Sequence, residues 1–157
     1  NNNHYIRLQE DMKFVKESFE TNDPLGKALL TDYLERRGHD VYPNPDRYGI
    51  DLYSIKEDKK LWWEVEVKIG RPWTTMEDFQ FPTVSFLSRK KKWEDTDFWY
   101  CIICSETRAA LMCFSSIIFK EEYREEKYIN KGGRRGKDTF YRVPKKYCIF
   151  VEPKDFI

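Results

Sequence analysis

The chain has 157 residues, a length that suits one domain with a single hydrophobic core. Its 28 basic and 27 acidic side chains nearly cancel, so the net charge of +1 excludes a uniformly basic or acidic protein and says nothing about partners. No apolar run approaches the roughly 20 residues that span a bilayer, and the asparagine-led start is not a signal peptide. We therefore expect one soluble, cytoplasmic domain over residues 1–157, without a membrane partner.

Four cysteines lie in apolar runs of the sequence, at positions 101, 104, 113 and 148. Apolar surroundings favour buried, reduced thiols. A zinc site needs a second pair of ligands that converges with the first, and Cys101-Ile-Ile-Cys104 has no matching pair. We therefore do not expect zinc.

The first part of the chain predicts two helices followed by three strands. Apolar residues recur at helical spacing over residues 8–19 and 25–37, and Gly38 is a typical residue after a helix C-terminus. Extended segments are predicted over residues 39–42, 50–55 and 61–69, the last two separated by the polar turn Glu57-Asp-Lys-Lys60.

The second part of the chain predicts strands that widen this sheet. Residues 71–80 contain Pro72 and little periodicity, which indicates a loop or a short helix. Further strands are predicted over residues 83–87, 98–105, 109–114 and 147–151, with a helical turn over residues 115–119. The charged, glycine-containing segment over residues 120–140 is predicted to form an exposed basic arm or hairpin.

Charged side chains alternate along the third predicted strand, which reads Trp62-Trp-Glu64-Val-Glu66-Val-Lys68. Alternate residues of a strand share a face, so the two glutamates and the lysine point the same way. An antiparallel turn can bring Asp51 close to Glu66 and Lys68. Two carboxylates could then hold Mg²⁺, which polarises a phosphate oxygen, while the lysine orients the attacking water. The alternative is the solvated face of an amphipathic strand, with Asp51 as an ordinary acid near a turn.

Residues 24–69 resemble the core of the PD-(D/E)XK nuclease superfamily, which includes type II restriction enzymes and junction resolvases. The resemblance depends on Tyr48-Gly-Ile-Asp51 and Glu66-Val-Lys68, in the order helix, strand, strand, strand. It implies an α/β fold with a restriction-endonuclease-like core, in which helices flank a central mixed β-sheet. It also implies that Asp51, Glu66 and Lys68 are catalytic.

The same resemblance implies a metal site. Mg²⁺, replaceable by Mn²⁺, would be bound by Asp51, Glu66 and the carbonyl of Val67, with Asp46 of Pro45-Asp46 as a competitor for the first acid. Many members also carry a glutamate on the first core helix, whereas this chain reads Gly26-Lys27-Ala28 there. An additional acid would then come from Glu64 or Glu20, or else from Glu17 or Asp23.

Two basic clusters are candidates for DNA binding, because lysine and arginine neutralise phosphates and release counterions. The alternative for the first cluster is a solvated loop. The residues are Arg89, Lys90, Lys91 and Lys92 in the first cluster and Arg134, Arg135 and Lys137 in the second.

The leading hypothesis is a metal-dependent DNA endonuclease that hydrolyses phosphodiester bonds, of a size typical of phage or mobile-element enzymes. One alternative within this class is a structure-specific junction resolvase or nickase, which would act as a homodimer. The alternative of another class is a catalytically inactive nucleic-acid-binding or assembly module with a nuclease fold. The absent helix acid favours the inactive module, and the retention of Asp51, Glu66 and Lys68 favours the enzyme.

Overall fold

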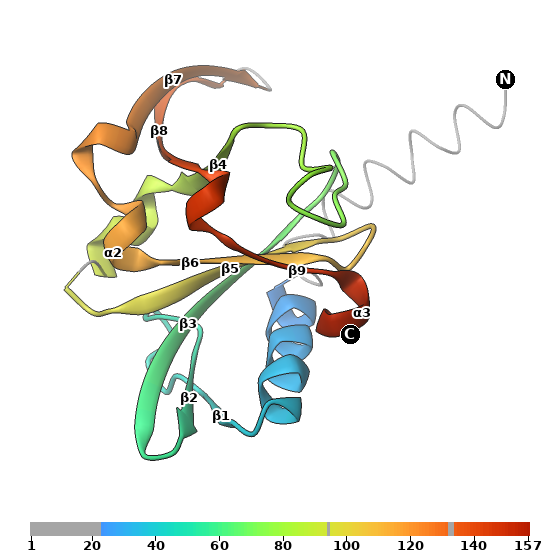
Figure 1. Cartoon of the computed structure of the whole chain (residues 1–157). Helices are drawn as coiled ribbons and strands as arrows, with labels where there is room; N and C mark the ends of the chain where they lie inside the picture. Colours follow the sequence, from blue (N-terminus) through green and yellow to red (C-terminus); the bar gives the residue numbers. More distant parts are fainter. Residues whose placement is uncertain (1–22, 94, 132–133) are drawn as a thin grey trace, which may run out of the picture.

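A computed structural model describes residues 23–93, 95–131 and 134–157 (Figure 1). The predicted helix over residues 8–19 lies outside these residues, as do Glu17 and Glu20. The predicted second helix is confirmed over residues 23–36. It ends because Gly38 takes a positive φ of 88°, which lets His39 N donate to Leu34 O at 3.0 Å in a Schellman-type C-cap.

The larger sheet is mixed and has six strands in the order β1-β2-β3-β5-β6-β9. Its β3 and β5 pair in parallel, and its other neighbours pair antiparallel. The strands are β1 (Asp40–Pro43), β2 (Leu52–Lys56), β3 (Lys59–Lys68), β5 (Phe98–Cys104), β6 (Ala110–Phe114) and β9 (Ile149–Val151). This sheet confirms an α/β fold with a central mixed sheet.

A smaller antiparallel sheet has three strands in the order β4-β8-β7. Its members are β4 (Thr83–Leu87), β7 (Arg124–Lys131) and β8 (Arg134–Pro144). The charged segment predicted as an arm or hairpin therefore forms the β7–β8 hairpin. The short helical segments are η1 (Ser88–Trp93), α2 (Ser115–Ile118), η2 (Glu121–Tyr123), η3 (Lys145–Tyr147) and α3 (Pro153–Phe156).

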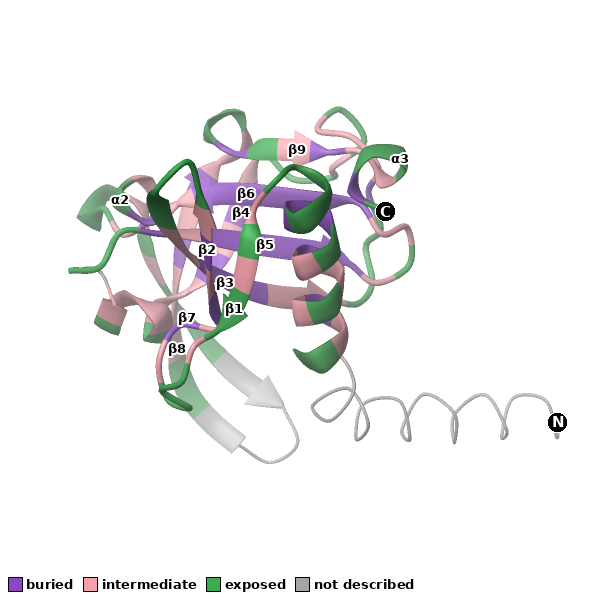
Figure 2. Cartoon of the chain, turned by 90° about the horizontal axis from the view of Figure 1, so that it is seen from below, coloured by how far each residue is buried: buried purple, intermediate pink, exposed green. Residues whose placement is uncertain are grey.

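The larger sheet is covered differently on its two faces (Figures 1 and 2). One face packs against the helix over residues 23–36 and against α3, as in the contact of Leu34 and Phe156 with the apolar side chains of β3 and β5. The other face packs against the smaller sheet, which contributes Phe86 and Tyr141. The second face is therefore covered mainly by a layer of strands, to which the short α2 adds Ile118.

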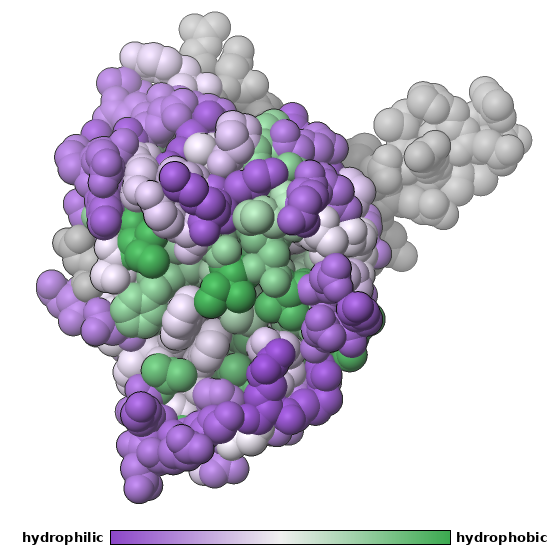
Figure 3. All heavy atoms as spheres, in the orientation of Figure 1, coloured by the Kyte–Doolittle hydropathy of each residue, from purple (hydrophilic) through white to green (hydrophobic). Residues whose placement is uncertain are grey.

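Several local predictions are confirmed. Residues 71–80 form no helix or strand, and the strands and helical turn expected after residue 83 form within one or two residues of the expected bounds. The strand over residues 83–87 does not widen the larger sheet as expected, because it pairs with β8 in the smaller one. All four cysteines are buried and form no disulfide. Among the described residues, no helix is long and apolar enough to cross a bilayer. Figure 3 shows apolar side chains gathered across the middle of the face on which β6 and β9 lie, with polar side chains above and below.

Candidate active site

The hairpin between β2 and β3 decides which acids meet. Glu57 and Asp58 both have positive φ, 51° and 62°, and form a two-residue turn that pairs Lys56 with Lys59. Leu52 consequently pairs with Trp63, and Asp51, one residue earlier, lies opposite Glu64. A four-residue turn over residues 57–60 would have placed Asp51 opposite Glu66. The predicted neighbourhood of Asp51 is therefore wrong by two residues.

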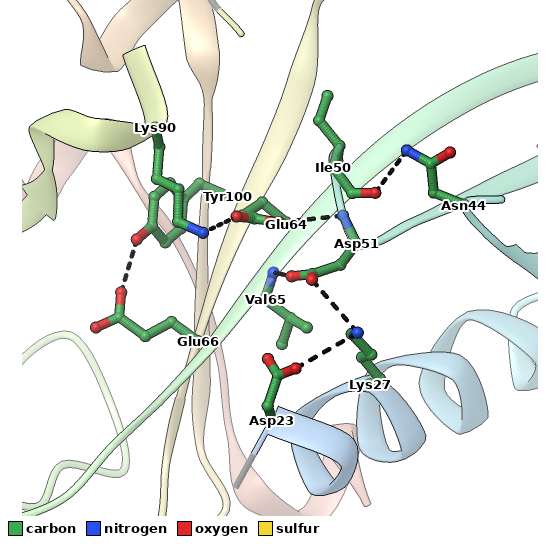
Figure 4. Close-up of polar contacts among 10 residues, drawn as sticks. All are labelled: Asp23, Lys27, Asn44, Ile50, Asp51, Glu64, Val65, Glu66, Lys90 and Tyr100. Carbon is green, nitrogen blue, oxygen red and sulfur yellow. Dashed lines mark hydrogen bonds and ion pairs between the residues drawn. The ribbon is translucent and has the colours of Figure 1, made fainter. Parts of the chain in front are cut away.

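Asp51 is fixed by hydrogen bonds on both its backbone and its side chain (Figure 4). Its backbone N donates to Glu64 Oε1 at 3.1 Å, and its Oδ2 accepts from Val65 N at 3.0 Å. Because β2 begins only at Leu52, the amide of Val65 has no partner on that strand, and the carboxylate of Asp51 satisfies it instead. Asp51 thus lies at the edge of β3.

The loop before Asp51 has its own hydrogen bonds. Asn44 Nδ2 donates to Ile50 O at 2.8 Å, and Asn44 N donates to Asp51 O at 3.2 Å. A Cβ on Gly49 would lie 2.6 Å from Asn44 Nδ2, so this side chain can cross the backbone only at a glycine. Asp46 accepts from Tyr48 N at 3.0 Å and stabilises this exposed turn. The Gly49-Ile-Asp51 motif therefore serves to position Asp51, and Asp46 serves the loop.

Two lysines contact the acid pair from opposite sides (Figure 4). Lys27 of the first described helix lies 3.6 Å from Asp51 Oδ1 and 3.4 Å from Asp23 Oδ2. Lys90 of η1 forms an ion pair with Glu64 Oε2. Lys90 was predicted to bind DNA, and Lys27 had no predicted role, although Lys27 lies on the helix where many PD-(D/E)XK nucleases carry a glutamate. The lysine at this helix position was the sequence feature that could have indicated a role for Lys27.

Burial gives Glu64 unusual electrostatics. The side chain is only 1% exposed, and this burial, together with the nearby carboxylate of Asp51, raises the pKa of Glu64 to about 8 against the opposing effect of Lys90. Partial burial acts to lower the pKa of Lys27, but the attraction of Asp51 and Asp23 outweighs it and raises that pKa. At neutral pH Glu64 therefore tends to keep a proton that a bound cation would displace.

Glu66 and Lys68 follow Glu64 on the same face of β3, as the alternation predicted, and this face points toward the smaller sheet. Tyr100 OH donates to Glu66 Oε2 at 2.7 Å, and burial, followed by the charge of Glu66, raises the pKa of Tyr100, which keeps it a donor. Lys68 Nζ donates to Ser85 O of β4 at 3.0 Å. Glu66 and Lys68 thus each have a partner other than Asp51.

The carbonyl of Val67 was the third predicted metal ligand. In a strand, the peptide groups of alternate residues point to the same side, so Val67 shares the open edge of β3 with Val65. It lies one strand repeat, about 6.6 Å, beyond Val65, whose amide contacts Asp51. The carbonyl of Val65, on the same edge, is therefore closer to Asp51 along β3 than the predicted carbonyl of Val67.

The predicted DNA-binding residues differ in their surroundings. Arg89 is exposed, whereas Lys92 lies 4.6 Å from the ring centroid of Trp93 and Lys91 lies 6.0 Å from that of Tyr141. Lys137 forms an ion pair with Glu126 at 3.2 Å. The side chains of Arg134 and Arg135 lie outside the described part of the chain.

The donor set fits a magnesium ion with waters better than a fully protein-bound metal. Within residues 23–93, 95–131 and 134–157, no three acidic, histidine or cysteine side chains group closely enough to enclose a metal. Mg²⁺, however, usually keeps several waters and is bound by one or two carboxylates together with substrate phosphate. Asp51 and Glu64 supply two hard carboxylate groups, and the buried Glu64 Oε2 has an ion pair but no hydrogen bond to the described residues.

No protein-family model matches this sequence, and a search of the curated proteins finds no match. The comparisons therefore assign no family or activity to the chain.

Proposed function

We propose that this protein is a metal-dependent DNA endonuclease that hydrolyses phosphodiester bonds. The observation that carries the proposal is the contact between Asp51 and the buried Glu64, whose pKa is raised to about 8. Two neighbouring carboxylates that are shielded from water repel each other when both are ionised. A divalent cation bound between them removes that repulsion. Strongly perturbed carboxylates are concentrated at functional sites, which favours catalysis over a purely structural role.

The residues of the site would have different roles in the reaction. Asp51 and Glu64 are the groups that would hold Mg²⁺ or Mn²⁺, and this ion would polarise a phosphate oxygen and lower the pKa of a bound water. Lys27 and Lys90 would attract the DNA phosphate and stabilise negative charge that develops on it. Glu66, oriented by Tyr100, is the adjacent carboxylate that could accept a proton from the attacking water.

One observation favours the second candidate, an inactive nucleic-acid-binding or assembly module with this fold. Lys27 and Lys90 already place positive charge against both carboxylates. Such a network of four groups could stabilise the junction of the first helix, β3 and η1 without any metal. The two functions predict different results for variants that keep both lysines and neutralise one carboxylate. An enzyme loses DNA cleavage in such a variant, whereas the inactive module shows no cleavage in the wild type either.

The first test is cleavage of DNA by the full chain and its variants. Supercoiled plasmid, single-stranded DNA and a four-way junction are incubated with Mg²⁺ or Mn²⁺, and products are separated on gels. Asp51→Asn and Glu64→Gln should each reduce the cleavage rate by about 100-fold or more, because even groups that only orient metal ligands contribute 10- to 100-fold. Glu35→Gln, which neutralises an exposed carboxylate on the same helix as Lys27, should cleave at the wild-type rate.

Cation binding provides an independent readout of the same site. Titration calorimetry with Mn²⁺ in buffers of different ionisation enthalpy should show release of a proton from Glu64 on binding, with tighter binding as the pH rises toward 8. Absence of both cleavage and proton-linked Mn²⁺ binding in the wild type, with DNA binding intact, would establish the inactive module. Cleavage retained by both carboxylate variants would disprove the assigned site.

A further inference from the structure

A cavity lies at the end of β3, the strand that carries Glu64. It has a volume of about 440 Å³, within the range of about 300–1,000 Å³ that is usual for small-ligand sites. Its wall is formed by the end of β3, the loop that follows, β4 and the β7–β8 hairpin, which lie together in the upper part of Figure 1. Along β3, Lys68 in this wall is four residues, or about 13 Å, from Glu64.

The cavity wall is cationic. Lys68, Arg71, Lys127 and Arg142 line it, and none of the described residues in its wall is acidic. Glu125 forms an ion pair with Arg142 at 3.0 Å, and Lys127 forms no ion pair with the described part of the chain. Several positive charges converging on a partly enclosed space favour an anionic group such as a phosphate.

The same wall is aromatic, which distinguishes it from a simple anion site. Phe81 is 39% exposed, and Arg71 lies over its ring, 4.8 Å from the centroid. Trp73 is only 3% exposed, and its indole nitrogen has no hydrogen-bond partner among the described residues. Gln80 and Thr83 add amide and hydroxyl groups. The cavity therefore offers a stacking surface, hydrogen-bonding groups and positive charge together.

We propose that this cavity binds one unpaired nucleotide of the substrate strand, with its base against Phe81 and its phosphate near Lys127 and Arg142. Exposed aromatic rings in a positively charged groove are the features by which proteins hold single-stranded DNA, because every base has a face that can stack. A base inside a duplex is already stacked and could not enter. The inference builds on the proposed function and narrows its substrate to DNA with an unpaired segment near the cleavage position.

The test measures binding without cleavage. Fluorescence anisotropy in EDTA follows the full chain binding a labelled oligothymidylate of about 16 nucleotides, a length suited to single-strand sites, and a duplex of equal length. Phe81→Leu should raise the dissociation constant for the single strand about tenfold, since stacking on one aromatic ring contributes about that much. The duplex constant should not change. Thymidine 5′-monophosphate in excess should displace the single strand from the wild type.

Charge is tested by the salt dependence. Lys127→Gln should lower the slope of log K against log salt for the single strand by about 0.7, the value for one phosphate contact. Two matched controls should bind as the wild type does. Tyr42→Leu removes a ring that is 43% exposed on β1, and Lys59→Gln removes an exposed strand lysine at the β2–β3 turn.

The outcomes separate this inference from the nuclease proposal. The nucleotide cavity is overturned, whatever the cleavage assay shows, if Phe81→Leu and Lys127→Gln leave single-strand binding unchanged. It is also overturned if these variants weaken duplex binding as much as single-strand binding. Weakened single-strand binding in a protein that never cleaves DNA overturns the nuclease and leaves the cavity standing. Cleavage that depends on Asp51, together with selective loss of single-strand binding in Phe81→Leu, supports both.

Discussion

The two faces of the larger sheet bury different chemistry. The face toward the helix over residues 23–36 is an apolar cluster. Among the described residues, its one fully buried polar side chain is Ser54, which is neutral and accepts a hydrogen bond from Trp63 Nε1 at 2.9 Å. The face toward the smaller sheet buries Glu64, a carboxylic acid, and places Glu66 and Lys68 beside it.

A buried carboxyl group is thus present on one face of the sheet only, among the described residues. Taking an ionised carboxylate out of water costs several kcal/mol, and replacing a buried ion pair by apolar groups is often stabilising. The helix-side face achieves its packing without such a group. Stability alone therefore does not explain Glu64, which strengthens the case that the acid serves binding or catalysis.

The largest effect is expected when a charge is placed on the apolar face. Ile103 on β5 is fully buried within the helix-side cluster. Ile103→Glu should lower the free energy of unfolding by more than about 4 kcal/mol, because an unpaired charge is buried there. Urea denaturation followed by tryptophan fluorescence measures it, and Ile103→Val, expected to lose about 1 kcal/mol, is the control. A loss below about 1 kcal/mol for the glutamate would show that the faces do not differ.

On the other face, the charge is tested by pH. The pKa of Glu64 is about 8 in the folded protein against an ordinary value of 4.5, so the folded state binds more protons between these values. The free energy of unfolding should therefore be highest below about pH 4.5 with respect to this group and fall as the pH rises through 8, with a slope of up to about 1.4 kcal/mol per pH unit.

Glu64→Gln isolates this contribution. Subtracting its pH profile from that of the wild type removes the effect of the other titrating groups. Saturating Mg²⁺ should flatten the wild-type decline, because a bound cation stabilises the ionised carboxylate, and should not alter the variant's profile. Wild type and variant with the same slope between pH 5 and 8 would contradict the raised pKa.

The sequence predicted the local elements well because their signals are local. The helix that stops at Gly38 and the apolar strand β5 follow from periodicity, a glycine and a run of strongly β-forming residues. The parallel pairing of β3 with β5 and the second sheet depend on contacts between distant segments. No pattern in the sequence announces them.

The site was only partly predictable for a specific reason. The register of Asp51 is set by Glu57 and Asp58, which take positive φ without being the asparagine and glycine that usually mark such a turn. A four-residue turn over residues 57–60 would pair Asp51 with Glu66, whereas the two-residue turn pairs it with Glu64. Lys27 and Lys90 reach the acids only through the packing of a helix and of η1, which residue spacing does not reveal.

The smallest change in the free energy of unfolding is expected for Gly26→Ala, which tests how closely the helix must lie against β3. A Cβ on Gly26 would lie 3.0 Å from Val67 Cγ2 and 3.3 Å from Val65 Cγ2. Gly26→Ala gains about 1 kcal/mol of helix propensity, but overpacking costs about 1–3 kcal/mol, so a net loss of up to about 2 kcal/mol is expected in urea denaturation.

The double variant Gly26→Ala/Val67→Ala separates crowding from propensity. If crowding dominates, Val67→Ala should be less destabilising in the Gly26→Ala background than in the wild type, which a double-mutant cycle measures as a coupling energy. Lys27 follows Gly26 on the helix, so relieving the crowding should also restore any DNA cleavage that Gly26→Ala has lost. Additive free energies and unrestored cleavage would mean that the helix does not position Lys27 against Asp51 through this contact.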